Sequence, residues 1–404
     1  MHDSSVLSLL VFVVIGLVTL NAISYYANKL ISLPNIIWTL LLGVTYGLAV
    51  QLTDLPLPEV SLSPEVVLFV FVPLLVFAAT QKICLFHFRK VVPAASLLGT
   101  VGIVISMGVI ASVLHFGFAF DWLSSLLFGV IMSATDPLAV GALLHGNKHT
   151  SPDTKLLIEG ESILNDGFVV TVFGILLVLL LEQEGITWTT STGLFVSHVA
   201  GALLLGTALA RVTRWLLRVW HEEHFTFQIN LTVALAFGSY LLAEHLGFSG
   251  ILAVFAAALA FGYKPGPKNR QIDVRNYVWE YFEYLANAVL FFLLGASFMA
   301  GIASVGMAIP LLLVSLALLF FARLVSIGIL WPVVARMSLT LTKIDFWLLN
   351  VAGARGAVSV ALILLLPAEF AYKSLFLGLA FYMILFSLLV YPLITKWLLT
   401  RNDM

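Results

Sequence analysis

Four carboxylates stand inside strongly apolar stretches of this chain, and they are the residues best suited to chemistry. Asp136 belongs to residues 133–137, Ser-Ala-Thr-Asp-Pro, and Glu159, Glu161 and Asp166 follow in a second stretch. A charged side chain at the centre of a membrane helix costs about 2.5 to 3.5 kcal/mol on the insertion scale. Such acids are therefore expected to bind an ion, a proton or a fixed opposite charge.

The first of these acids lies at a predicted helix break. Pro137 donates no backbone hydrogen bond and disfavours helical geometry at Asp136, so the helix should be interrupted near the middle of the membrane. Irregular backbone at that depth is tolerated only where it is buried in protein or lines a cavity. Thr135 and Asp136 either satisfy the broken turn or bind an ion or substrate. The second interpretation is favoured because an ionisable group lies on the break.

The second stretch presents two polar faces if it is helical. At about 100° per residue, Glu159, Ser162 and Asp166 fall within about 60° of one another, while Glu161 and Asn165 lie roughly 110° round the helix. A rise of about 1.5 Å per residue puts Asp166 about 15 Å from the cytoplasmic end, near the bilayer centre. Asp166 is therefore predicted to be the working acid, whereas Glu161 suits a structural ion pair.

Two arginines also lie inside apolar segments. Arg355 is flanked by glycines at a depth of about 15 Å, which predicts a second interrupted or closely packed helix. This depth is similar to that of Asp166. Arg355 is therefore the predicted partner of Glu161 in a buried structural ion pair. For Arg323 the sequence leaves the partner open: an acid such as Glu280 or Glu283, or an interface.

Composition places these residues in an all-α polytopic membrane protein. The chain is 61% hydrophobic and 10% charged over 404 residues, with a mean hydropathy of +1.07, far more apolar than a soluble domain. About 20 apolar residues cross the hydrocarbon core, and thirteen such segments are predicted; the ninth, residues 249–263, is short. They are centred near residues 16, 44, 72, 105, 134, 168, 205, 237, 256, 289, 320, 356 and 386. The longest polar connections, 211–226 and 264–276, are loop-sized, so no soluble domain is expected.

The net charge and the cysteine content exclude some classes of partner and site, and the distribution of Lys and Arg predicts the orientation in the membrane. A net charge of −1 indicates no nucleic-acid partner, and the single cysteine, Cys84, excludes an internal disulfide and a multi-cysteine metal or redox site. Seventeen of the twenty Lys and Arg residues lie in connections that follow odd-numbered segments, and only Lys373 lies on the other side. The positive-inside rule then places the N-terminus outside and the C-terminus in the cytoplasm.

Segment order predicts an internal repeat. The two irregular segments, the fifth and the twelfth, are seven apart, and an odd offset reverses direction across the membrane. Six segments, a linker and six more give two inverted repeats, about 6–182 and 227–399, joined by a linker segment at about 193–217. Crossed discontinuous helices at the midplane of such repeats are typical of secondary transporters.

Four motifs together resemble a known family. They are residues 133–137, residues 159–167 (Glu-Gly-Glu-Ser-Ile-Leu-Asn-Asp-Gly), the region from Trp279-Glu280 through Asn287 to residues 291–295 (Phe-Phe-Leu-Leu-Gly), and residues 353–359 (Gly-Ala-Arg-Gly-Ala-Val-Ser). In this order they resemble the monovalent cation:proton antiporter-1 family, the prokaryotic relatives of the sodium/proton exchangers. The resemblance covers nearly the whole chain, so residues 1–404 are expected to form one transmembrane transporter domain in a prokaryotic cell membrane.

The resemblance implies roles for the individual residues. Asp166 would bind either Na⁺ or a proton, with Thr135, Asp136 and Ser162 supplying nearby oxygens and Asn165 beside the site. Glu161 and Arg355 would form the structural ion pair. Glu159 either attracts cations at the cytoplasmic entrance or lies near the lipid headgroups. The family also implies a homodimer in the lipid bilayer, and a transporter that is not an enzyme and needs no cofactor.

A mechanism follows from competition for one site. A small hard cation that leaves water needs several oxygens, and the reachable ones are the Asp166 carboxylate, the Ser162 hydroxyl and carbonyls near Thr135. Burial disfavours the charged carboxylate, so Asp166 should take a proton near neutral pH when no cation is bound. Because Asn165 cannot ionise, one proton per cation and electroneutral exchange are expected, with Asp136 as the candidate for a second proton.

Some alternatives stay open in the sequence. Ala78 stands where the family often has an acid, which leaves the preference among Na⁺, Li⁺ and K⁺ undecided. A cation channel or a transport-inactive sensor could use the same architecture. Two aspartates on neighbouring segments also occur in intramembrane aspartyl proteases. However, those enzymes carry Gly-x-Gly-Asp, whereas Asp166 follows Leu164-Asn165.

Overall fold

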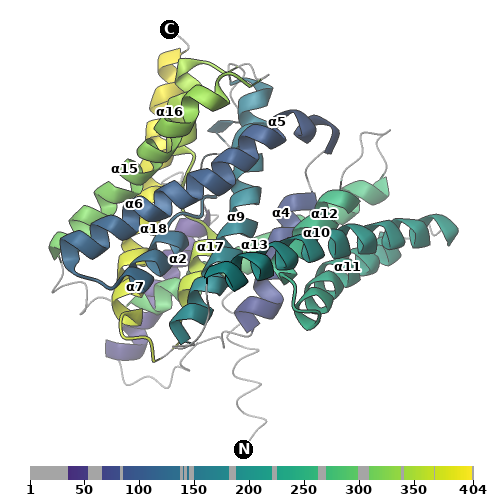
Figure 1. The fold of residues 1–404 in the computed structure, drawn as a ribbon, viewed down its shortest axis with the longest axis horizontal. Helices are drawn as coiled ribbons and strands as arrows, with labels where there is room; N and C mark the ends of the chain where they lie inside the picture. The colour runs from purple at the N-terminus through teal and green to yellow at the C-terminus, as the bar shows by residue number, and fades with distance from the viewer. Residues whose placement is uncertain are drawn as a thin grey trace, which may run out of the picture.

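The protein is described here from a computed structural model. It describes residues 35–52, 66–81, 85–136, 140, 143–144, 150–181, 188–220, 225–262, 270–298, 309–337, 341–367 and 369–402. Every regular element within these ranges is a helix (Figure 1). The helices are α2 (Asn35–Leu52), η1 (Val67–Phe71) running into α4 (Val72–Gln81), α5 (Leu85–Leu97) running through η2 (Leu98–Gly102) into α6 (Ile103–Phe118), α7 (Trp122–Ile131), α9 (Pro152–Leu181), α10 (Trp188–Val219), α11 (Phe225–His245), α12 (Gly250–Phe261), α13 (Arg270–Ala296), α15 (Ile309–Val334), α16 (Lys343–Val351), α17 (Ala357–Leu364) and α18 (Lys373–Asn402).

These helices confirm most of the predicted membrane segments. Six of those described are long and apolar enough to cross a membrane, and four more are shorter apolar helices. Each predicted segment from the second to the thirteenth overlaps a described helix, and the twelfth is divided between α16 and α17. The short ninth segment is α12, which begins where the Ser249 hydroxyl accepts a hydrogen bond from the Leu252 amide. The first predicted segment, near residue 16, lies outside the described residues.

Two predicted loops are partly helical instead. α10 continues through Arg211, Arg214 and Arg218 to Val219, and α13 already begins at Arg270. Arginine, leucine and tryptophan are compatible with a helix, and long basic side chains extend from the membrane boundary into water. The polar composition there therefore marks the membrane surface rather than a helix end.

The two predicted helix breaks are confirmed. α7 ends at Ile131 and the backbone from Met132 to Asp136 is not helical, while Pro137 itself lies outside the described residues. α16 ends at Val351 and α17 begins at Ala357 after a non-helical stretch. The breaks contact each other, because the Asp136 amide donates to the Ala354 carbonyl at 2.7 Å. Each break thus satisfies backbone groups that the other has freed, as buried irregular backbone requires.

The contact between the breaks is too close for a side chain at Gly356. A Cβ atom there would lie 2.1 Å from Asp136 Oδ2 and 2.2 Å from Asp136 Cβ. We expect Gly356→Ala to lower the stability by about 1 to 3 kcal/mol, the usual range for overpacking, as measured by thermal unfolding of the purified protein. Gly328→Ala is the matched control, since nothing lies within 4 Å of its Cβ position. Equal unfolding temperatures for the two variants would contradict the close packing.

Helix α9 lies between two groups of helices. Figure 1 shows α10, α11 and α12 on one side and α6, α15 and α18 on the other, with α9 between them. α9 packs against α5, η2 and α7, and also against α4 and α12. Its residues are therefore placed to contact both breaks and both groups.

Candidate functional site

Helix α9 carries several acidic and polar residues in the interior of the protein. Glu161, Ser162 and Asn165 are buried, whereas Glu159 and Asp166 are half-buried. The 3.6-residue period places Ser162 and Asp166 one turn apart on one face. This is the arrangement predicted from the sequence, and it puts a carboxylate and a hydroxyl beside the first break.

Ser162 and Asn165 hold Thr135 in place. The Ser162 hydroxyl donates to the Thr135 carbonyl at 2.6 Å, and the Thr135 amide donates to Asn165 Oδ1 at 3.4 Å. Asn165 Nδ2 donates in turn to the Thr135 hydroxyl. These three contacts fasten the irregular backbone of the first break to α9, so Asn165 acts here as a support for the break.

The Asp166 carboxylate accepts no hydrogen bond from any described residue. It interacts electrostatically with Asp136 and, more weakly, with Glu161, both of which repel its negative charge. Buried like charges are stable only when a cation or a proton neutralises part of them. The geometry therefore leaves Asp166 available for a positively charged occupant.

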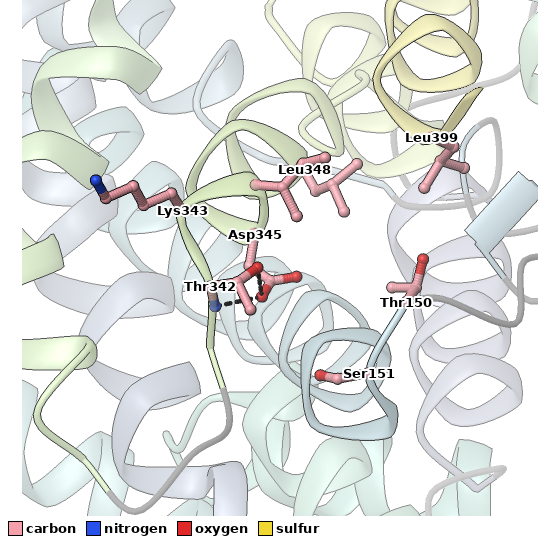
Figure 2. Close-up of a pocket in the computed structure, with 8 residues that line it drawn as sticks. Thr150, Ser151, Thr342, Lys343, Asp345, Leu348 and Leu399 are labelled. Carbon is pink, nitrogen blue, oxygen red and sulfur yellow. Dashed lines mark hydrogen bonds between the residues drawn. The ribbon is translucent and has the colours of Figure 1, made fainter. Parts of the chain in front are cut away.

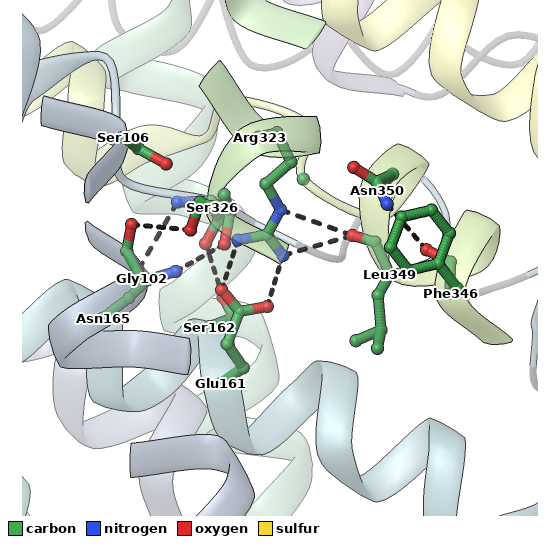
Figure 3. A network of polar contacts seen from close by, with 12 residues as sticks. Gly102, Ser106, Glu161, Ser162, Asn165, Arg323, Ser326, Phe346, Leu349 and Asn350 are labelled. Atoms are coloured by element: carbon green, nitrogen blue, oxygen red, sulfur yellow. Dashed lines mark hydrogen bonds and ion pairs between the residues drawn. The ribbon is translucent and has the colours of Figure 1, made fainter. Parts of the chain in front are cut away.

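Glu161 pairs with Arg323 rather than with Arg355, which corrects the predicted ion pair. Arg323 Nη1 donates to Glu161 Oε1 at 2.6 Å and Nη2 to Oε2 at 2.5 Å, a bidentate contact. Both residues are buried: Glu161 is 1% exposed and Arg323 is 3% exposed. Figure 3 shows the guanidinium between Glu161 and the Leu349 carbonyl, to which it also donates at 3.2 Å. Arg323 thus joins α9, α15 and the last turn of α16.

The position of Arg323 has a clear physical cause. Leu349 lies in the last turn of α16, where carbonyls lack helical partners and attract a positive charge. Arg355, in the second break, donates instead to the Gly353 carbonyl through Nη1. Arg355 interacts electrostatically with Glu161, but no carboxylate of a described residue lies within ion-pair distance of it. Arg323 and Arg355 lie at similar depths, roughly 16 to 18 Å from Val334 at the end of α15 and from Lys343 at the beginning of α16. Depth alone therefore does not predict which arginine pairs with Glu161.

Further hydrogen bonds brace this network from the neighbouring helix. The Ser326 hydroxyl on α15 donates to the Gly102 carbonyl at 2.7 Å, at the end of the π-helical turn η2 (Figure 3). Gly99, in the same turn, lies so close to α9 that a Cβ atom there would be 3.0 Å from the Glu161 carbonyl. η2 therefore contacts α9 directly behind the site, and π-helical turns are frequent at functional sites.

A separate cavity of about 390 Å³ lies where α9 and α16 begin and α18 ends (Figure 2). The Asp345 carboxylate on its wall accepts from the Thr154 hydroxyl at 2.9 Å and from the Thr342 amide at 2.6 Å. Ser151 on its wall is about 22 Å along α9 from Asp166. Because Asp345 caps α16 and is already bonded, this cavity is not the candidate site.

The donor set around Asp166 consists of oxygen atoms. Within the described part of the chain, no group of three or more His, Cys, Asp or Glu side chains could hold a metal ion. The Asp166 carboxylate, the Ser162 hydroxyl and the Thr135 carbonyl remain, and each keeps lone pairs beyond the hydrogen bonds it makes. Oxygen ligands of this kind suit a hard, weakly bound cation rather than a transition metal.

Interrupted helices that meet beside a half-buried acid are typical of one class of protein, the secondary membrane transporters. Comparison with known families identifies the member of this class. The family model described as "Sodium/hydrogen exchanger, transmembrane" matches residues 7–401. The chain belongs to this family, whose members are transporters and not enzymes.

Three relatives match over most of their length. The chain is 30% identical to the low-affinity Na⁺/H⁺ antiporter NhaS1 of Synechocystis, over 92% of this chain and 71% of that protein. It is 30% identical to the Na⁺/H⁺ antiporter NhaP of Pseudomonas aeruginosa, with 94% and 93% covered, and 29% identical to NhaH of Halobacillus dabanensis, with 98% of each covered. The sodium proton antiporter MjNhaP1 of Methanocaldococcus jannaschii has the same fold, with a TM-score of 0.72, 19% identity and 97% and 98% covered.

Proposed function

We propose that this protein exchanges Na⁺ for H⁺ across a membrane, with both ions competing for Asp166. The observation that carries the proposal is the half-buried Asp166 carboxylate, which accepts no hydrogen bond from the described residues and lies one turn from Ser162. Family membership and the Na⁺/H⁺ antiporters among the relatives support it. Na⁺ is the substrate, and no cofactor is involved.

Na⁺ binds to oxygens of α9 and of the first break. Asp166 supplies the charge, and Ser162 and Thr135 supply neutral oxygens, while Asp136 adds negative potential nearby. Glu159, closer to the beginning of α9, attracts cations at the cytoplasmic entrance. Ala78 is fully buried in α4 and its side chain has no oxygen. The site therefore relies on α9 and the first break, and Na⁺, Li⁺ and K⁺ are discriminated there.

Transport proceeds by alternating access of one site. The chain is organised as two inverted six-helix repeats whose discontinuous fifth helices cross, and the contact of the two breaks at Asp136 and Ala354 supports this arrangement. The helix group around α10, α11 and α12 stays in place while the group with the breaks moves against it. Movement is allowed only when Na⁺ or a proton neutralises Asp166, because a bare charge is too costly in the closed site.

The protein acts as a homodimer in the bacterial inner membrane. Its N-terminus is outside and its C-terminus is cytoplasmic, an orientation supported by the basic residues in the connections after odd segments. The Na⁺ gradient and the H⁺ gradient alone then determine the direction of exchange, either internal Na⁺ for external H⁺ or the reverse.

Coupling distinguishes this proposal from a channel on the same fold. The purified protein is placed in sealed vesicles with a clamped membrane potential, and NaCl, LiCl and KCl are added in separate experiments. An antiporter releases protons only when a transported cation is added, and the rate saturates with cation concentration. Cation flux without proton movement would indicate a channel and end the proposal.

Electroneutral exchange is expected from the same experiment. Asn165 is not ionisable, so each cycle carries one proton for one Na⁺ and no net charge. The Na⁺ gradient that nulls proton flux should therefore be the same at every clamped potential. A gradient that shifts with the potential would contradict this stoichiometry. Asp136→Asn would then show whether Asp136 carries the additional proton, since potential independence should return in that variant.

A further inference from the structure

Three arginines gather far from Asp166, at the end of α10 and the beginning of α13. Arg214 and Arg218 lie one turn apart on α10, and Arg275 lies in the first turns of α13. We call these three residues the arginine cluster. Nothing in the exchange mechanism uses them.

Phe261, the last residue of α12, brings the cluster together. Arg214 Nη2 donates to the Phe261 carbonyl at 2.9 Å, a group that has no helical partner because the helix ends there. The guanidinium carbon of Arg275 lies 5.3 Å from the centre of the Phe261 ring. Arg214 on α10 and Arg275 on α13 therefore both contact Phe261, and their positive charges repel each other.

The charge of the cluster has no counter-ion in the described part of the chain. Arg275 is only 7% exposed, and its Nε atom is buried without a hydrogen-bond partner. No described carboxylate lies within ion-pair distance of any of the three arginines. Arg218 adds a third positive charge beside Arg214. Arg275 Nη2 donates to Asn276 Oδ1 at 3.4 Å, but this neutral oxygen does not balance the charge. A buried cation without a counter-ion is unfavourable, so we expect an anion to join the cluster.

The surroundings indicate which anion this is. Trp215 and Trp220 flank the cluster on α10 and are 59% and 52% exposed, and exposed tryptophans of a membrane helix lie at the level of the lipid headgroups. The positive-inside pattern puts this end of α10 on the cytoplasmic face, where anionic lipids are available. Guanidinium groups bind phosphate oxygens through paired hydrogen bonds.

We propose that Arg214, Arg218 and Arg275 form a binding site for the phosphate group of an anionic lipid. Arg214 and Arg218, which are half-buried and exposed, hold the phosphate oxygens, and Arg275 behind them supplies the field that favours an anion. The bound headgroup ties α10 to α13 and to the end of α12. Because α12 packs against α9, the lipid stabilises the helix group against which the site moves.

The test measures thermal unfolding of the full-length protein in neutral detergent with added lipid. Phosphatidylglycerol should raise the unfolding temperature by several degrees, and phosphatidylcholine should not. Arg214→Gln and Arg275→Gln should each lose most of this shift. Arg336→Gln, which removes an exposed arginine at the end of α15, is the matched control and should keep it.

Two further measurements distinguish a lipid headgroup from free phosphate and test lipid binding independently of thermal unfolding. Inorganic phosphate is added in place of lipid: a shift of the same size, lost in the same variants, would assign the site to a free phosphate ion instead of a headgroup. If Arg275→Gln does not fold, native mass spectrometry of Arg214→Gln counts bound phosphatidylglycerol, with fewer molecules expected than in the parent. An unchanged shift and an unchanged lipid count in Arg214→Gln would overturn the proposal, as would equal shifts with both lipids.

Discussion

Asp166→Asn is expected to abolish Na⁺-driven proton movement while the protein still folds. The amide has nearly the shape of the carboxylate, so packing in α9 is kept. However, it cannot alternate between a charged form that binds Na⁺ and a neutral form that carries a proton. Proton release from vesicles on addition of NaCl should fall to the level of protein-free vesicles, and the unfolding temperature should stay equal to or above that of the parent, since a repulsive charge is removed.

The matched control is another aspartate on the same helix. Asp153 lies in the first turn of α9 and pairs with Lys90 at 2.6 Å, outside the proposed site. Asp153→Asn should keep most of the exchange activity, because Asp153 lies about 20 Å along α9 from Asp166. Near-normal exchange by Asp166→Asn would remove that residue from the mechanism.

Arg323→Ala is expected to have the largest effect on stability. It leaves the buried Glu161 carboxylate without its bidentate partner and the Leu349 carbonyl without a donor. Breaking a buried pair on one side costs about 3 to 5 kcal/mol. The free energy of unfolding of the purified variant should therefore fall by this amount, and α16 should become more accessible to hydrogen exchange near Leu349.

A double variant separates the pair from the rest of the network. Glu161→Gln combined with Arg323→Met leaves no unpaired charge and should recover a large part of the loss, as replaced buried pairs often do. Arg355→Ala should cost less than Arg323→Ala, since no described carboxylate pairs with it. A larger loss in the free energy of unfolding for Arg355→Ala than for Arg323→Ala would contradict the conclusion that the Glu161–Arg323 pair stabilises the fold.

The sequence predicted those parts of the molecule that depend on one segment at a time. Apolar length located twelve helical segments, and Pro137 and the glycines beside Arg355 marked the two breaks, because both signals act on the local backbone. The 3.6-residue period placed Ser162 and Asp166 on one face of α9. Each of these depends on residues close in the chain.

Lateral contacts between segments could not be predicted in the same way. Position along a segment gives depth in the membrane, but it does not say which helix lies beside which. For this reason the sequence predicts Arg355 as the partner of Glu161, although Arg323, which lies at a depth similar to that of Arg355, makes the contact. The bonds from Asn165 to Thr135 depend equally on how α9 meets the first break, and no spacing in the sequence contains that information.

Competition between Na⁺ and H⁺ for Asp166 is the central claim, and the pH dependence of Na⁺ binding tests it most directly. Initial exchange rates are measured in vesicles over a series of NaCl concentrations at several pH values on the binding side. If a proton excludes Na⁺ from the same carboxylate, the apparent KM for Na⁺ rises by about tenfold for each pH unit of acidification once the site is protonated, while the maximal rate at saturating Na⁺ is unchanged. An apparent KM that stays constant as the pH falls, with only the maximal rate reduced, would show that the two ions do not share Asp166.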